Sequence, residues 1–171
     1  MCGSASPLAV KRPTWRVRPA RRDDLPDLVR LWKAYMREMR PRTKYYGPPD
    51  AAAVRDWKKG IAPALGGRKA RAFVAVDGAK IVAMLFVEPI THDPHIRPRR
   101  AGYIHSAYVR PRYRRQGILS ALSEEAERWS AARGLRAMAA WVLVDNREAL
   151  KAWRRFGYVT SAEYLIRTGP V

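Results

Sequence analysis

The segment around Gly117 joins an apolar run, a basic turn and an amphipathic helix. The apolar run ends at Val109, and the turn that follows contains Arg110, Arg112, Arg114 and Arg115. Free backbone N–H groups, a helix N-terminus and guanidinium groups in one place favour phosphate binding. The chain has neither the Walker lysine pattern nor G-x-G-x-x-G, so we expect a ligand other than a P-loop nucleotide or a Rossmann dinucleotide.

The composition indicates one folded domain with a strong positive charge. The chain has 171 residues, 47% of them hydrophobic, and a formal net charge of +19. This length suffices for a single core, and the charge favours anionic partners. Nucleic acid is a partner that we consider but do not favour, because an arginine-rich composition accounts for the charge equally well. The single cysteine, Cys2, cannot form an intrachain disulfide and suits a reducing compartment.

The N-terminal segment contains small residues, prolines and basic residues but no long apolar stretch. We therefore expect residues 1–14 to be a flexible tail without a secretory signal, and residues 15–171 to form a single domain. No run of about eighteen apolar residues occurs, so no membrane span is expected. These features predict a cytoplasmic protein.

Periodicity predicts alternating strands and helices. Strands are expected over residues 15–18, 72–76, 80–88, 102–109, 135–144 and 159–167. Helices are expected from Asp23 or Asp24 to Pro41, from Asp50 to Gly66, from Gln116 or Gly117 to Arg133, and from Asp145 or Asn146 to Gly157. The strand over 80–88 is apolar on both faces and should be central. This order indicates an α/β domain, a mixed sheet with helices on both faces.

Two motifs lie in the second half of the chain. The first is Val109-x-Pro111 followed by Arg114-Arg115-Gln116-Gly117-Ile118-Leu119, and the second is Asn146-x-x-Ala149 followed by Phe156-Gly157-Tyr158. The first resembles the acetyl-CoA-binding motif of the GNAT superfamily of N-acetyltransferases, Q/R-x-x-G-x-G/A. The second is similar to the downstream N-x-x-A…G-F/Y of that family. The resemblance covers roughly residues 15–167 and implies a GNAT-like, mostly antiparallel sheet with acetyl-CoA as cosubstrate.

The resemblance assigns a role to each matching position. Arg114 matches the leading Q/R, and Gly117 matches the glycine that lets the backbone approach the pyrophosphate. The backbone N–H groups at the helix mouth are expected to hold the phosphates, and these belong to Gln116, Gly117, Ile118, Leu119 and Ser120. The guanidinium of Arg114, together with those of Arg112 and Arg115, is expected to clamp them. Ala107 and Val109 lie where the family pairs strand backbone with the acetyl carbonyl and pantetheine. Asn146 matches an asparagine that contacts the cofactor arm, although a helix cap is an equally good interpretation.

The sequence departs from the family pattern at two positions. Leu119 replaces the final small residue of the first motif, and Trp153 replaces a tyrosine that often serves as the acid. An indole N–H donates a hydrogen bond but cannot deliver a proton at neutral pH. We therefore expect Trp153 to pack in the core and the thiolate to leave without a tyrosine acid.

An amine must lose a proton before it attacks a thioester. His105 alternates with Tyr103, Ala107 and Val109, so we expect its side chain on their face of the strand, and its ordinary pKa of about 6.5 suits a base. Glu88, at the end of the neighbouring central strand, is the second candidate. A water relay is a third, and either side chain could instead be structural. With no cysteine in the motif region, direct transfer is expected.

The remaining interpretations concern metals and partners. His92-Asp93-x-His95 has two imidazoles and one carboxylate, but we expect a loop and no metal. The acceptor is expected to be a primary amine of a small molecule or peptide, and the charge argues against a polycation. The alternative is an acyl-CoA-binding or basic nucleic-acid-associated module without catalysis. A homodimer is also considered.

Overall fold

A five-stranded sheet forms the centre of the protein. The computed structural model describes residues 14–162 and 165, and the strands lie in the order β1-β2-β3-β4-β5. They are β1 (Trp15–Pro19), β2 (Arg71–Asp77), β3 (Lys80–Thr91), β4 (Arg100–Val109) and β5 (Met138–Ala140). The first four pair antiparallel, and β5 runs parallel to β4. The predicted mixed, mostly antiparallel sheet is confirmed.

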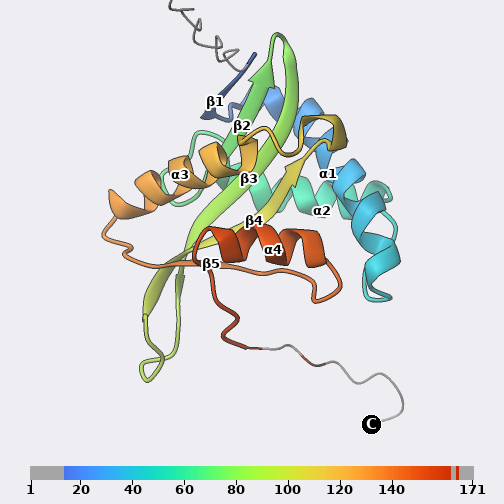
Figure 1. Cartoon of the computed structure of the whole chain (residues 1–171). Helices are drawn as coiled ribbons and strands as arrows, with labels where there is room; N and C mark the ends of the chain where they lie inside the picture. The colour runs from blue at the N-terminus through green and yellow to red at the C-terminus, as the bar shows by residue number, and fades with distance from the viewer. Residues whose placement is uncertain (1–13, 163–164, 166–171) are drawn as a thin grey trace, which may run out of the picture.

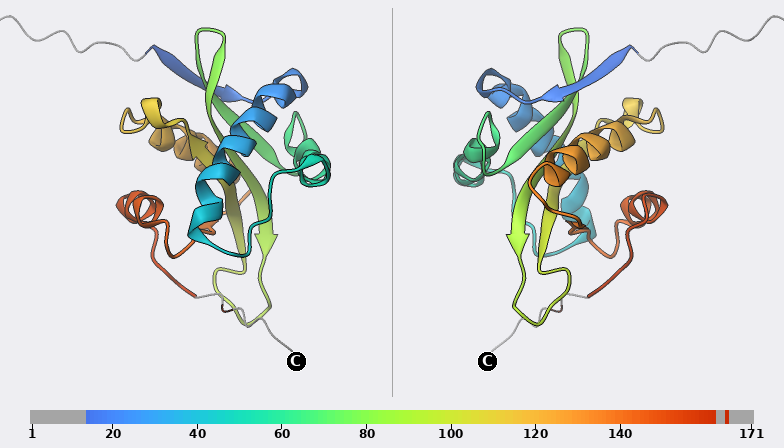
Figure 2. Two further views of the ribbon diagram at one scale, coloured as in Figure 1. Left: turned by 90° about the vertical axis from the view of Figure 1, so that its right-hand side faces the viewer. Right: turned by 90° about the vertical axis from the view of Figure 1, so that its left-hand side faces the viewer.

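Helices cover both faces of this sheet (Figures 1 and 2). On one face lie α1 (Leu25–Met39) and α2 (Ala51–Ile61), and on the other lie α3 (Ile118–Ala131) and α4 (Arg147–Arg155). The predicted α/β arrangement with helices on both faces is therefore confirmed.

The sheet separates two hydrophobic cores, and β3 contributes to both. Met84 and Phe86 pack with the side chains of α1 and α2, including Leu28. Leu85 and Val87 point to the opposite face, where they pack with α3. The strand is buried on both sides, as its continuous apolar sequence predicts.

The predicted helix ends agree only in part with the structure. Asp50 caps α2 by accepting a hydrogen bond from the Ala53 N–H at 2.8 Å. Asp24 precedes α1 but does not cap it with its side chain. Its carboxylate instead accepts two hydrogen bonds from the Arg18 guanidinium, at 2.7 and 2.9 Å, and a third from the Arg21 N–H. Asp24 therefore joins β1 to the start of α1.

We expect Asp24→Asn to lower the free energy of unfolding by about 2 kcal/mol at neutral pH, the range for hydrogen bonds to a charged group. The Arg18 hydrogen bonds hold the pKa of Asp24 below its ordinary value despite burial. This stabilisation is thus present above the ordinary carboxyl pKa and is lost as the pH falls through the lowered value. Urea unfolding at several pH values tests this, with the exposed Asp23→Asn as control. Equal stabilities of the two variants would contradict it.

Two predicted strands differ from the structure. The strand expected over 135–144 is reduced to β5, because the chain diverges from β4 after Ala140, where β4 itself becomes irregular. The strand expected over 159–167 is wrong for residues 159–162 and 165, which are not in a strand. Val159 and Leu165 are each 85% exposed and pack against no sheet. The rest of that segment, and residues 1–13 of the expected tail, lie outside the described residues.

Candidate active site

A β-bulge interrupts β4 near its C-terminal end. Phe86 of β3 is paired with His105, whereas Met84 is paired with Tyr108. Two residues of β4, Ser106 and Ala107, therefore lie opposite one residue of β3. Ser106 has a φ of 52°, which lies in the left-handed region. A bulge of this kind bends the strand and changes the direction of the side chains that follow it.

The bulge places His105 and the two predicted cofactor residues of β4 on opposite faces of the sheet. The imidazole of His105 stacks on Phe86, with ring centroids 5.7 Å apart, and Phe86 belongs to the core formed with α1 and α2. Ala107 and Val109 pack on the α3 side. The prediction that these three side chains share one face is wrong, because the extra residue at the bulge shifts the alternation by one position.

The edge of β4 that faces away from β3 is only partly covered. β5 pairs with β4 from Gly102 to Ile104 and no further. Among residues 14–162 and 165, no strand pairs with this edge beyond Ile104, and the bulge begins two residues later. An unpaired strand edge offers backbone donors and acceptors to an extended ligand.

The turn after β4 leaves the N-terminus of α3 open to an anion. Gly117 is its N-cap, with φ 80°, and no side chain caps the helix. The Gly117 carbonyl accepts its intrahelical hydrogen bond from Ala121 at 3.0 Å. The N–H groups of Ile118, Leu119 and Ser120 therefore lack an acceptor within the helix and point out of its positive end.

The side chains of the motif hold this turn in place. Gln116 donates a hydrogen bond to the Arg112 carbonyl at 3.0 Å, and the Ser120 hydroxyl donates to Glu124 at 3.1 Å. Ile118 is buried and Leu119 packs against the α3-side core. The leucine at the last motif position thus contributes its side chain to packing, which leaves its N–H at the helix mouth.

The guanidinium of Arg114 interacts with side-chain and backbone groups of the protein itself. It forms an ion pair with Glu38 of α1 at 2.6 Å, and its Nε donates to the Val109 carbonyl at 3.0 Å. The same guanidinium lies over the Tyr108 ring. Arg114 therefore ties the turn to β4 and α1, whereas Arg112 and Arg115 are exposed at the turn.

Asn146 connects the start of α4 to the end of α1. Its side-chain oxygen caps α4 by accepting from the Ala149 N–H at 3.3 Å, and it accepts a second hydrogen bond from Arg42 at 2.8 Å. Arg42 also lies 3.6 Å from Glu38. The helix cap is thus one role of Asn146, and its contact with a cofactor stays a prediction.

The two candidate bases are brought together at the β3–β4 pair. His105 Nε2 lies 4.0 Å from Glu88 Oε1, and Nδ1 lies 3.4 Å from the Ser106 hydroxyl. Burial lowers the pKa of His105 below 6.5, although the Glu88 carboxylate acts in the opposite direction. A neutral imidazole at physiological pH can accept a proton. The geometry therefore gives the site a base with a neighbouring carboxylate.

Trp153 occupies a packed position on α4. It is buried, and its ring makes edge-to-face contacts with Phe156 and Tyr158 at centroid distances of 5.9 and 5.1 Å. Burial raises the pKa of Tyr158. The indole thus lies among aromatic side chains, as expected for a packing role.

The sequence interpretation missed several aromatic residues near His105. The ring of Tyr103 stacks against that of His105, with centroids 5.9 Å apart, and the rings of Tyr46 and Trp141 lie 6.3 Å apart. Tyr35 of α1 forms a hydrogen bond with Tyr46. These residues come from four separate segments, so no local motif indicates that they meet.

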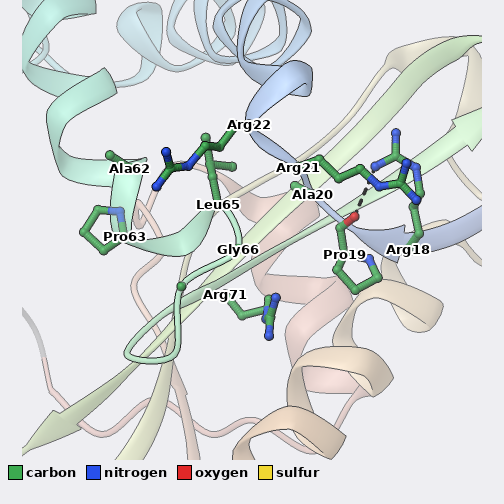
Figure 3. A pocket seen from close by; sticks show the side chains of 11 residues that line it. Arg18, Pro19, Ala20, Arg21, Arg22, Ala62, Pro63, Leu65, Gly66 and Arg71 are labelled. Carbon is green, nitrogen blue, oxygen red and sulfur yellow. Dashed lines mark hydrogen bonds between the residues drawn. The ribbon is translucent and has the colours of Figure 1, made fainter.

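A hollow of about 570 Å³ lies elsewhere on the surface (Figure 3). It is bounded by the end of β1, the start of β2 at Arg71 and the segment after α2 around Leu65. Arg22 and Arg71 are among its lining residues. β1 is an edge strand that β2 and β3 separate from β4, so this hollow is distinct from the site at the bulge.

Residues 14–162 and 165 provide neither a metal-ligand cluster nor a membrane-spanning helix. No group of three or more His, Cys, Asp or Glu side chains there is placed to hold a metal ion, and this includes the segment from His92 to His95. No helix in the same residues combines the length and apolar character needed to cross a membrane.

Comparison with known proteins identifies the family. Residues 26–158 match the Acetyltransferase (GNAT) family, and the chain belongs to it. The chain is 27% identical over 146 residues to an uncharacterized N-acetyltransferase from Methanocaldococcus jannaschii, a match that covers 85% of this chain and 61% of that protein. It thus spans less than two thirds of that relative.

Solved structures share the fold. A predicted acetyltransferase from Clostridium acetobutylicum, crystallised with acetyl-CoA, superposes with a TM-score of 0.73 at 17% identity, covering 90% of this chain and 96% of that one. An aminoglycoside 6'-N-acetyltransferase from Acinetobacter haemolyticus gives 0.69 at 19% identity, covering 91% and 99%. The predicted GNAT-like fold is confirmed.

Proposed function

We propose that the protein is an acetyl-CoA-dependent N-acetyltransferase that passes the acetyl group directly to a primary amine. The observation that supports this most strongly is the adjacency of two sets of free backbone groups. One is the unpaired edge of β4 beyond Ile104, and the other is the uncapped N-terminus of α3 after Gly117. Pantetheine amides suit the first set and a pyrophosphate suits the second. GNAT membership supports the same assignment.

We assign the cofactor contacts accordingly. The backbone of Ala107 and Val109 faces the pantetheine and acetyl carbonyl, and the N–H groups from Gln116 to Ser120 hold the phosphates. Arg112 and Arg115 are free to supply charge at the turn, whereas Arg114 holds the turn in shape through Glu38. Asn146 fixes the start of α4 beside this region.

The proposed reaction needs one base and a thiolate leaving group. His105 takes a proton from the ammonium form of the acceptor, and the Glu88 carboxylate 4.0 Å away stabilises the imidazolium that results. The neutral amine nitrogen then attacks the thioester carbon, the C–S bond breaks and CoA departs as the thiolate. The thiolate takes up the second proton that the nitrogen loses as the amide forms. A thiol has a pKa of about 8.5, so the thiolate leaves without a strong acid. An amide and free CoA are the products.

Trp153→Phe is expected to leave turnover within about tenfold of the parent, or about 1.4 kcal/mol of barrier. The reason is that Trp153 packs against Phe156 and Tyr158 and has no proton to deliver. Steady-state rates of thiol release, in protein whose fold is checked by circular dichroism, test this. A loss of several orders of magnitude in folded protein would give the indole a chemical role.

The direct test of this function uses acetyl-CoA with a pooled set of primary amines. Thiol release that depends on the amine, with the acetylated product identified by mass spectrometry, is the expected result. Calorimetric binding of acetyl-CoA in the absence of amines is the companion measurement. Acetyl-CoA binding without turnover on any amine would contradict catalysis.

A non-catalytic, nucleic-acid-associated function is the second candidate. The net charge of +19 favours it, as do two cation-lined hollows, one between Arg22 and Arg71 (Figure 3) and one on α4 with Arg147 and Arg154. Phosphate contacts would make RNA binding fall steeply with salt. Salt-sensitive RNA binding that Arg22→Glu combined with Arg71→Glu abolishes, together with an absence of turnover, would favour this function.

A further inference from the structure

A cluster of partly exposed rings lies beside the proposed base. We define the ring cluster as Tyr46, Tyr103, His105 and Trp141. Tyr103 and His105 stack at a centroid distance of 5.9 Å, and Tyr46 and Trp141 lie 6.3 Å apart with their planes inclined by 30°. All four side chains retain some exposure, and Trp141 is 46% exposed. Partly exposed rings that gather in one place, unlike a single exposed side chain, form an apolar patch that can contact a ligand.

Tyr35 of α1 interacts with one member of each ring pair. It is partly buried, contacts the Tyr108 ring edge-to-face, forms a hydrogen bond with Tyr46 and interacts electrostatically with Tyr103. Burial raises the pKa of Tyr35, Tyr46 and Tyr103, so all three hydroxyls are neutral at physiological pH. The tyrosines therefore add no negative charge to the ring cluster.

The charges around the ring cluster allow one ammonium group and disfavour several. Glu88 is the carboxylate beside His105 and interacts with Tyr103. Glu38 of α1 is already paired with Arg114 and Arg42, and Glu148 of α4 also acts on the Arg114 guanidinium. A polyamine or aminoglycoside brings several positive charges, each of which needs an anionic partner. A single ammonium group needs only one.

We propose that the acceptor is a monoamine whose nitrogen is attached to an aromatic body that stacks on the ring cluster. This inference rests on the proposed function and specifies its substrate class. With the nitrogen at His105 and Glu88, the rest of the acceptor lies over the adjacent rings. Offset or edge-to-face contacts between aromatic groups contribute about 0.5–1.5 kcal/mol each beyond buried area, and the rings also attract the ammonium before it loses its proton.

The experiment compares 2-phenylethylamine, hexylamine and spermidine as acceptors, by thiol release with saturating acetyl-CoA. We expect kcat/KM for 2-phenylethylamine to exceed those for the other two at least tenfold. Trp141→Ala should remove most of this preference, largely through KM. Tyr45→Ala is the matched control, since Tyr45 is next to the cluster in sequence and similarly exposed, at 45%. It should keep the preference.

A second measurement separates this inference from the proposed function. Binding of 2-phenylethylamine to the complex with CoA is followed by saturation-transfer NMR in the parent and in Trp141→Ala. Turnover with equal kcat/KM on all three amines, or a preference unchanged in Trp141→Ala, overturns the inference and leaves the proposed function intact. Absence of turnover combined with Trp141-dependent binding contradicts the proposed function and supports the aromatic site. Absence of both turnover and binding overturns the inference.

Discussion

Gly117→Glu should abolish acetyl-CoA binding as measured by calorimetry. Gly117 is the N-cap of α3 and has a φ of 80°, a conformation that is costly for residues with a side chain. The new carboxylate would lie next to the N–H groups of Ile118 and Leu119, where it would compete with the phosphates for the positive helix end. Steric hindrance, charge repulsion and backbone strain thus act in the same direction.

Gly134→Glu is the matched control for the backbone strain that a side chain causes at Gly117. Gly134 follows the other end of α3, has a φ of 71°, and a side chain there would meet no neighbouring atom within 4 Å. It therefore imposes a similar backbone cost without placing a carboxylate near the phosphates. We expect Gly134→Glu to bind acetyl-CoA like the parent. Unchanged affinity in Gly117→Glu, or an equal loss in both variants, would contradict the assigned phosphate site.

His105→Ala should lower kcat/KM by about a hundredfold or more, within the range for the loss of a general base. The imidazole stacks on Phe86 and Tyr103, and its Nε2 faces Glu88. Truncation removes the proton acceptor but leaves acetyl-CoA binding in place, since the phosphate turn is formed by other residues. Full activity in the variant would make His105 a structural residue.

The pH profile distinguishes the two candidate bases. Burial lowers the pKa of His105, so kcat/KM of the parent should rise with pH through one ionisation below 6.5. That ionisation should vanish in His105→Ala. The Glu88 carboxylate raises the pKa of His105, so Glu88→Gln should move the ionisation to lower pH while much of the activity remains. Loss of activity in Glu88→Gln with a normal His105→Ala would make Glu88 the base.

The fold is predictable from the sequence where hydrophobic periodicity coincides with residues that typically begin or end a helix or strand. The two-sided apolar run from Ile81 to Val87 predicts the central strand, and Asp50 marks the start of α2, as the structure confirms. Asp24 has the same residue type and spacing as a cap, yet it binds Arg18. Competition between a local cap and a distant guanidinium cannot be read from neighbouring residues, because it depends on how β1 lies against α1.

The site is predictable only where it is built from contiguous residues. The segment from Arg114 to Ser120 forms a single turn and helix start, so its sequence indicates an anion-binding backbone. The bulge at Ser106 is different, because Tyr103, His105, Ala107 and Val109 alternate in sequence as they would in a regular strand. The extra residue is visible only in the pairing with β3. For the same reason, the contact between Arg114 and Glu38, which are far apart in the sequence, became known only from the structure.

A crystal structure of the protein with acetyl-CoA tests the proposed cofactor site most directly. We predict the pyrophosphate on the N–H groups from Gln116 to Ser120, the pantetheine along the free edge of β4, and the acetyl carbonyl at the bulge close to His105. The cofactor would contradict this placement if it lay in the hollow between Arg22 and Arg71, or if its thioester lay away from the bulge.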